Sequence, residues 1–355
     1  MRKLSAIAAL FAVFFSLTSC EVEFSPNADW KEVPVVYCVL NQDDDTTWVR
    51  VQRCFLSEDN FYNHTSISDS TNYPQGALEV KLLKWNAYRI NPTSPFLAPY
   101  GDAPVAVYDF DYYEREHRDG AFGYQFQPLY GARTYHQLDS NFVYQLVVLK
   151  APSGDTLASA YTSLLGSNAK ITKLNDFSVN NTNALFRFVG TDGKCSISWT
   201  PWTRARLYQP MVRFYYRQDG EVRHVDVKCP DIKDNGRSSS VTSVLSRGTF
   251  FTEIADALKD DTSAKSFVHY VDVMVSGCNE DLKAYTESIS AIHSGATNSQ
   301  VYTNIDNGIG IFGARRVMVA RIPSDSAVGN ETYLQQLVDL HVGFEKSLAK
   351  VDIER

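Results

Sequence analysis

Apolar and polar positions alternate along most of the chain from residue 33 onward. Val33–Leu40 and Trp48–Leu56 are rich in β-branched and aromatic residues, and the polar segment 41–47 separates them. In the second run Val49, Val51 and Phe55 alternate with polar or mixed residues, a period of two that gives a strand one mostly apolar face. The pattern predicts a β-hairpin with one face toward a core.

Similar runs recur through the rest of the first half of the chain. They are Ala77–Trp85, Pro104–Phe110, Phe142–Leu149 and Thr156–Thr162. Their spacing is typical of a β-sandwich rather than of a parallel sheet. The segments 57–76, 86–103 and 111–133 are long polar and aromatic stretches that we interpret as connections. Connections of that length are usually functional or mobile.

The second half continues the strand pattern and adds helices. Strands are expected at Ala184–Val189, Lys194–Thr200, Leu207–Arg217, Val222–Cys229, Phe267–Val275, near Tyr302 and at Arg315–Ile322. Thr249–Leu258 has its apolar residues on one stripe, which predicts an amphipathic helix. Asn279–Ser288 opens with Asn279, Glu280 and Asp281, residues that suit a helix N-terminus, and Glu331–Leu340 predicts a short third helix.

The N-terminus has a composition of its own. Met1, Arg2 and Lys3 precede an apolar stretch that ends in Leu17-Thr18-Ser19-Cys20. Charge, apolar core and small residues indicate a secretory signal. An uncleaved membrane helix is the alternative, but residues 4–19 span only about 24 Å against a hydrocarbon core of about 30 Å. The last four residues resemble the lipobox of bacterial lipoproteins, which implies cleavage after residue 19 and acylation of Cys20.

Residues 21–32 are polar, contain Pro26 and show no period, so we expect a tether at 20–32. Glu21 and Glu23 resemble an acidic signal for export to the cell surface, although acids in a tether also serve solubility. Both a cell-surface and a periplasmic position on the outer membrane stay open. About 335 mature residues with 44% hydrophobic composition suit two domains, which we place at 33–165 and 166–355.

Charge and cysteine content limit the partners and the covalent chemistry. Removing Arg2 and Lys3 with the leader lowers the formal charge from −7 to −9, which argues against nucleic acid. Besides Cys20 the chain has five cysteines, an odd number, so in an oxidising compartment at least one thiol stays unpaired. They are Cys38, Cys54, Cys195, Cys229 and Cys278. A Cys38–Cys54 disulfide across the first hairpin requires the right register, and buried unpaired cysteines are the favoured alternative.

The sequence shows no catalytic motif. Gly308–Gly313 matches G-x-G-x-x-G, but a strand pattern follows where a dinucleotide site needs a helix, so we interpret the segment as a glycine-rich β-turn. The seven histidines lack ligand spacing, and we expect no metal and no cofactor. The acidic residues Asp109, Asp111, Glu114 and Glu116 could include a glycosidase pair, but exposed acids usually serve solubility.

Several segments together resemble an uncharacterised lipoprotein family of the Bacteroidota. Besides the lipobox they are Trp30–Tyr37, Trp48–Val51, Ile197–Pro201 and Tyr302–Gly313. The resemblance implies a mainly β protein of two β-sandwich domains, immunoglobulin-like or fibronectin type III-like, with a few short helices in the second. It also implies an outer-membrane location and a TonB-dependent transporter as a candidate partner.

Two further sets of residues are candidates for contacts and modification. The tyrosines Tyr100, Tyr108, Tyr112, Tyr113, Tyr124 and Tyr130 cluster with Phe122 around the connections of the first domain, and aromatic side chains make good binding surface. Trp199 and Trp202 are expected in the core instead. Short signals that resemble O-glycosylation sites of the same bacteria point to Thr46, Ser70, Thr156 and Ser326.

We therefore expect a non-enzymatic binding or accessory module, anchored in the lipid bilayer through acylated Cys20, with a transporter or a glycan as its partner. The alternatives are a fimbrial or adhesive subunit that assembles by strand addition and a glycan hydrolase.

Overall fold

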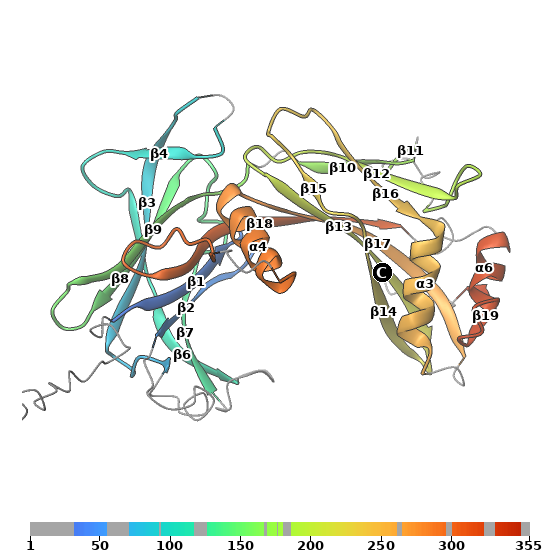
Figure 1. Ribbon diagram of the computed structural model, residues 1–355, viewed down its shortest axis with the longest axis horizontal. Helices are drawn as coiled ribbons and strands as arrows, with labels where there is room; N and C mark the ends of the chain where they lie inside the picture. Colours follow the sequence, from blue (N-terminus) through green and yellow to red (C-terminus); the bar gives the residue numbers. More distant parts are fainter. Residues whose placement is uncertain are drawn as a thin grey trace, which may run out of the picture.

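The computed structural model shows a mainly β protein, which confirms the predicted fold class. It describes residues 32–54, 71–91, 94–116, 126–166, 169–175, 177–179, 186–260, 265–295, 300–322 and 331–348. Two β-rich lobes lie side by side, and helix α4 (Glu280–His293) lies where they meet (Figure 1).

The first lobe is a sandwich of two sheets. Its larger sheet continues into the second lobe. In the first lobe that sheet contains β1 (Pro34–Leu40), β2 (Thr46–Arg53), β7 (Phe126–Arg133) and β6 (Asp111–Glu116), in that order. The facing sheet has the order β4 (Leu97–Tyr100), β3 (Leu78–Arg89), β8 (Val143–Lys150) and β9 (Thr156–Ser163), and β5 (Ala106–Asp109) also pairs with β3. Inward side chains such as Leu40, Val49, Leu82 and Leu146 are almost fully buried and form the core between the sheets.

Part of the first lobe differs from the sequence-based prediction. The segment 111–133, predicted as a connection, contains the antiparallel pair β6 and β7, with Tyr112 opposite Tyr130. The segment 86–103 contains the end of β3 and all of β4. Both predictions were wrong because neither edge strand shows a clear alternation of buried and exposed positions. The residues of β6 are almost all exposed, and β4 has only four residues, one of them Pro99.

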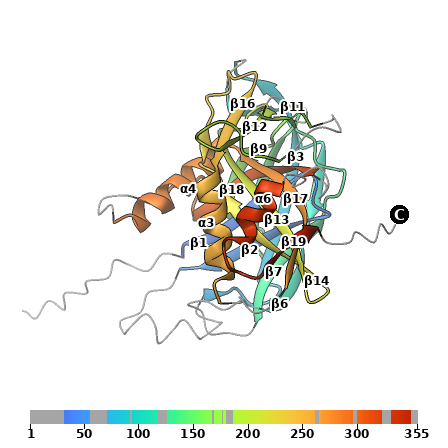
Figure 2. The ribbon, with the colours of Figure 1, turned by 90° about the vertical axis from the view of Figure 1, so that its right-hand side faces the viewer.

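The second lobe also has two sheets. One contains β14 (Glu221–Lys228), β13 (Leu207–Gln218) and β17 (Ser266–Cys278), with β15 (Ile232–Lys233) and β19 (Phe344–Leu348) pairing at its margins. The other has the order β11 (Phe177–Ser178), β10 (Lys170–Leu174), β12 (Lys194–Thr200) and β16 (Val241–Ser246). Helices α3 (Arg247–Leu258) and α6 (Glu331–Val338) lie at the end of this lobe away from the first lobe, the side that faces the viewer in Figure 2.

Predictions for the second half were accurate where the alternation was strong. The strand predicted at Lys194–Thr200 has those bounds, and Thr249–Leu258 lies within α3. Tyr302 was wrongly placed on a strand, because residues 301–305 form an irregular segment, and β16 was missed. The fibronectin type III assignment of this lobe stays a prediction.

Strand β18 (Ile309–Ile322) belongs to both lobes. Its first half, up to Ala314, pairs in parallel with β1, and its second half, from Arg315, pairs antiparallel with β17. One sheet of ten strands among the described residues therefore runs through the whole molecule. The domain division between residues 165 and 166 stays a prediction, and residues 309–314 of β18 pair with a strand of the first lobe.

The segment Gly308–Gly313 is strand rather than turn, because β18 begins at Ile309. Gly310 has a φ of +117° and lies opposite Val36 of β1. A Cβ atom on Gly310 would overlap the Val36 carbonyl oxygen. The glycines thus allow a close parallel contact between two strands, as Gly does wherever backbone approaches backbone.

The five described cysteines are all unpaired in the structure. Cys38 lies opposite Val49, whereas the amide of Cys54 donates to the carbonyl of Val33, five residues from Cys38. That register separates the two cysteines along the hairpin by roughly 16 Å, too far for a disulfide. Burial raises the pKa of Cys195, Cys229 and Cys278 to about 12, so these thiols stay protonated.

Candidate functional site

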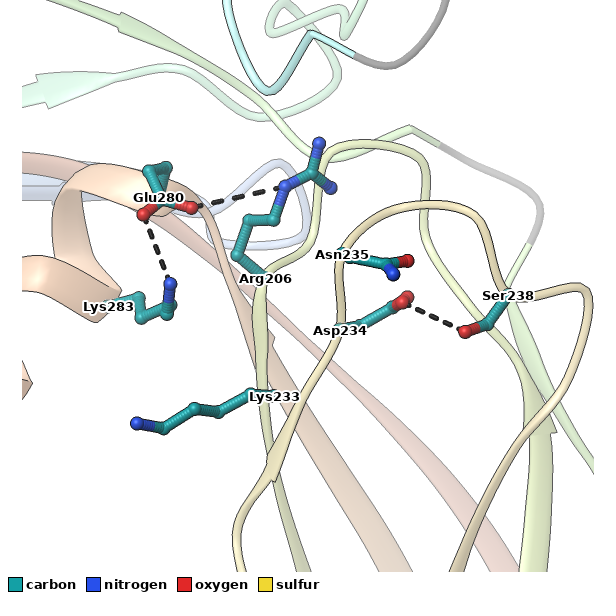
Figure 3. Close-up of a pocket in the computed structure, with 7 residues that line it drawn as sticks. All are labelled: Arg206, Lys233, Asp234, Asn235, Ser238, Glu280 and Lys283. Atoms are coloured by element: carbon teal, nitrogen blue, oxygen red, sulfur yellow. Dashed lines mark hydrogen bonds and ion pairs between the residues drawn. The ribbon is translucent and has the colours of Figure 1, made fainter.

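A polar pocket of about 420 Å³ lies near the junction of the two lobes, and we call it the junction pocket. Figure 3 shows the side chains that surround it, which come from three separate segments of the chain. Its lining residues are Arg206, Lys233, Asp234, Asn235, Ser238, Glu280 and Lys283. All seven are polar or charged, so the pocket suits a hydrophilic ligand rather than an apolar one.

Arg206 forms the buried wall of the junction pocket. Its backbone is fixed on both sides, since its amide donates to the carbonyl of Cys278 and its carbonyl accepts from the amide of Asp234. The side chain is only 6% exposed, Nη1 donates to the carbonyl of Ala205 at 2.8 Å, and Nε lies 3.9 Å from Glu280. An arginine held in this way presents its charge in a fixed direction.

The second segment is the turn from Asp234 to Ser238. Oδ1 of Asp234 accepts from the amide of Gly236 at 3.1 Å and from the hydroxyl of Ser238 at 3.0 Å (Figure 3). Gly236 has a φ of +78°, and a Cβ there would lie 2.5 Å from Nη1 of Arg206. Glycine therefore lets the turn close against the guanidinium group.

The other carboxylate oxygen of Asp234 is the most informative atom of the site. Asp234 is 7% exposed, and its Oδ2 is buried with no hydrogen-bond partner among the described residues. A buried acceptor without a donor costs free energy, about 1–3 kcal/mol for a neutral group and more for a charged one. A ligand that donates to Oδ2 would recover that cost.

The third segment is the first turn of α4. Asn279 caps the helix by accepting from the amide of Leu282, which places Glu280 and Lys283 one turn apart on the pocket side. Nζ of Lys283 lies 3.1 Å from Oε1 of Glu280. Lys233 reaches the same helix further along, with Nζ 2.8 Å from Glu287.

These groups give the junction pocket both donors and acceptors. The ammonium groups of Lys233 and Lys283 and the amide of Asn235 donate, and the carboxylates of Asp234 and Glu280 accept. The ion pairs of Arg206, Lys233 and Lys283 each join the cation to a glutamate, so the pocket has no large excess of one charge. Such a site matches a ligand that also carries donors and acceptors side by side, as the hydroxyl groups of a sugar do.

The structure does not bring the candidate tyrosines together on one surface. Tyr130 is buried on β7, where burial raises its pKa to about 12, and Tyr112 packs edge-on against it at 5.8 Å. Tyr108 is partly buried against the core. Tyr113 is exposed beside Trp48 on the larger sheet, whereas Tyr100 is exposed on the facing sheet. Tyr124 and Phe122 lie outside the described residues.

Other candidates from the sequence take separate positions. Thr46 is partly buried at the start of β2 and Thr156 is exposed at the start of β9, while Cys20, Ser70 and Ser326 lie outside the described residues. The acids Asp109, Asp111, Glu114 and Glu116 are all exposed. Asp109 forms an ion pair with Lys81 at 3.1 Å, and Asp111 belongs to a different sheet. Asp109 and Asp111 therefore do not form the carboxylate pair of a glycosidase cleft.

Trp199 and Trp202 are core residues, as predicted. Trp199 is fully buried on β12, and its ring centroid lies 5.4 Å from that of Tyr208. The ring of Trp202 stacks on that of Tyr208, with the two ring centroids 6.1 Å apart. Neither lines the junction pocket.

The sequence contains one local signal for the junction pocket. Asp234-Asn235-Gly236 is a strong turn motif after a strand. No local pattern, however, shows that this turn meets Arg206 and the start of α4.

Comparisons with known proteins give no family. No protein-family model matches the chain, and no curated protein sequence matches it. Within the described residues, none of the helices has the length and apolar character needed to cross a bilayer, and no cluster of histidine, cysteine and acidic side chains there is arranged to hold a metal ion.

Proposed function

We propose that this protein is a non-enzymatic binding module, held at the outer membrane by lipid chains on Cys20, that binds a glycan in the junction pocket. The lipobox at 17–20 and the polar tether at 20–32 support the anchoring. Several acyl chains make such an anchor effectively permanent, because each buried methylene contributes about 0.8 kcal/mol.

The unpartnered Oδ2 of Asp234 is the observation that carries the glycan proposal. A sugar hydroxyl donates one hydrogen bond and accepts others, so it can donate to Oδ2 while a neighbouring hydroxyl accepts from Asn235. The pocket volume of about 420 Å³ falls in the range of small-molecule sites.

The composition of the pocket wall argues against catalysis by a nucleophile with a neighbouring base. The described lining residues include no histidine, and the hydroxyl of Ser238 donates to Oδ1 of Asp234 and so fixes the turn. A nucleophile activated by a neighbouring base is the usual basis of covalent catalysis. We therefore assign Asp234 to ligand binding.

Asp234→Asn is expected to weaken saccharide binding about tenfold or more. The substituted side chain keeps one acceptor oxygen for Gly236 and Ser238 but presents an NH₂ donor where Oδ2 now lies, so a ligand hydroxyl meets a second donor. Calorimetric titration of the mature protein with a panel of neutral and acidic oligosaccharides measures the change. Asp192→Asn, an exposed carboxylate that does not line the pocket, serves as the matched control.

Two outcomes would contradict the glycan proposal. Equal affinities of the Asp234→Asn and Asp192→Asn variants would show that the junction pocket is not the binding site. Hydrolysis of any oligosaccharide in the panel, lost in Asp234→Asn, would assign the protein to the hydrolases instead.

Cys20→Ala is expected to move the protein from the membrane fraction to the soluble fraction, because the substitution removes the acylation site. Detergent-phase partitioning of both forms measures the shift, and an affinity pull-down from native outer membranes tests the partner. Recovery of one TonB-dependent transporter with the lipidated form would support the accessory role. A Cys20→Ala form that stays in the membrane fraction after a carbonate wash would refute lipid anchoring.

A further inference from the structure

The second half of β18 has one edge that no described strand pairs with. Beyond Ala314, β1 turns away, and the remaining residues pair only with β17 on the opposite edge. The open edge adjoins a groove of about 460 Å³, whose walls are Ala169–Ile171 with Val179 and Met318–Ile322.

The hydrogen bonds of β18 show which backbone groups point to the open edge. The amide and carbonyl of Phe312 bond the side chain of Asn304, and the amide and carbonyl of Ala314 bond Asn279, which directly follows β17. Phe312 and Ala314 therefore face the β17 edge. Successive residues of a strand direct their N–H and C=O groups to opposite edges. Val317, Val319 and Arg321 consequently direct theirs to the open edge.

The side chains along this edge are arranged for a further strand. Val317 and Val319 are 37% and 53% exposed on the outer face, while Met318 and Ala320 are half-buried toward the groove. An added strand would give the two valines cross-strand neighbours and would cover Met318 from the groove side. An exposed strand edge with apolar side chains is a template for such pairing.

Charge identifies the kind of strand that fits. Arg315 and Lys170 are exposed at the edge and on the groove wall. Arg316 and Arg321 already form two-bond ion pairs with Asp43 and Asp272. Asp43 and Asp272 thus balance the charges of Arg316 and Arg321, and the charges of Arg315 and Lys170 make the open edge positive. A second copy of the same edge would bring arginines against arginines, whereas an acidic segment would find opposite charge.

We propose that the open edge of β18 binds an extended, acidic segment of a partner polypeptide by β-strand addition. Backbone hydrogen bonds from Val317, Val319 and Arg321 hold the segment, its apolar residues contact the exposed valines, and its acidic residues face Arg315 and Lys170. This site is separate from the junction pocket and does not depend on the proposed glycan binding.

The test uses a synthetic seven-residue peptide of alternating valine and threonine with aspartate at both ends, titrated into the full mature chain. The same peptide with lysine at both ends, and an N-methylated form that lacks the donors of one edge, are the matched ligands. We expect the aspartate peptide to bind about tenfold more tightly than either. Hydrogen exchange should show new protection of the Val317, Val319 and Arg321 amides, whereas the Met318 and Ala320 amides should be protected from the outset.

Val319→Pro tests the edge from the protein side. It removes an N–H that points away from β17, so the fold should persist while peptide affinity falls about tenfold, and Val319→Thr should retain binding. Should Val319→Pro fail to fold, the N-methylated peptide gives the same comparison with the natural chain. No binding of the aspartate peptide at about 1 mM, equal binding of the N-methylated form, or a dimer of the protein that Val319→Pro dissociates would each overturn the proposal.

Discussion

Gly310→Ala is expected to destabilise the protein by at least about 3 kcal/mol, one of the largest effects of any single methyl group in this chain. The backbone at Gly310 has a φ of +117°, where side chains other than hydrogen are strained, and the added Cβ would overlap the carbonyl oxygen of Val36. The group that the added Cβ would overlap belongs to the backbone of Val36, so it cannot rotate away as a side chain could. Urea denaturation followed by tryptophan fluorescence measures the loss.

The effect of Gly310→Ala should extend beyond the first lobe. Gly310 lies in the half of β18 that pairs with β1, and the other half of the same strand pairs with β17. Separating β18 from β1 would therefore break the ladder that joins the two lobes. We expect two unfolding transitions in the variant where the natural chain has one, because each lobe retains sheets of its own.

Gly154→Ala is the matched control for Gly310→Ala. Gly154 also has a positive φ, +76°, but a Cβ there would meet nothing within 4 Å. Its replacement should cost only the strain of the left-handed conformation, about 1 kcal/mol. Equal losses in the two variants would show that backbone strain alone, and not the contact with β1, makes Gly310 necessary.

The strands that the sequence predicted well share a physical feature. β8, β12 and β13 are central strands whose inward faces are buried, so apolar side chains recur at every second position. β6 is an edge strand with mostly exposed side chains, and β4 is an edge strand of only four residues, so both resemble connections in the sequence. β18 was recognised only from Arg315, because glycines in its first half are common in turns and the parallel partner lies 274 residues away in the sequence, as the pair Val35 and Ile309 shows.

The candidate site was less predictable than the fold. Tyrosine content indicated a binding surface on the first lobe. Adjacent residues of a strand face opposite sides of the sheet, however, so Tyr113 of β6 is exposed on one side, whereas Tyr112 packs against Tyr130 of β7 on the other. The junction pocket instead depends on ordinary polar residues from three distant segments. Arg206, Asp234 and Glu280 are common surface residue types, and only the tertiary fold buries Arg206 and Asp234 and brings Glu280 to the same pocket.

Asn279 caps a helix, as the sequence predicted, and also joins that helix to two strands. The sequence indicated a helix N-terminus there, and its side chain does cap α4 by accepting from the amide of Leu282. The same oxygen also accepts from the amide of Ala314 on β18, and the side-chain amide donates to Thr162 and Ser163 at the end of β9. Asn279 is 1% exposed, so these bonds are shielded from water.

Asn279→Ala is accordingly expected to cost roughly 3–5 kcal/mol. The substitution removes the cap and leaves the amide of Ala314 and the carbonyl of Ser163 without their buried partner. It also changes the surroundings of Asp281, whose carboxylate accepts from Tyr302 at 2.8 Å and whose pKa burial raises above the ordinary range. Denaturation at neutral pH, where that carboxylate is most costly to keep buried, should show the full loss.

Ser246→Ala separates capping from this wider network. Ser246 caps α3 by accepting from the amide of Thr249, and its hydroxyl also bonds the Thr249 hydroxyl, both in an exposed position. Its loss should therefore cost about 1 kcal/mol, the usual value of a helix cap. The difference between the two alanine variants then measures what Asn279 contributes by joining β9, α4 and β18. If both variants lost the same free energy, Asn279 would act as a helix cap alone, and the ladder of β18 would have to hold the two lobes together without it.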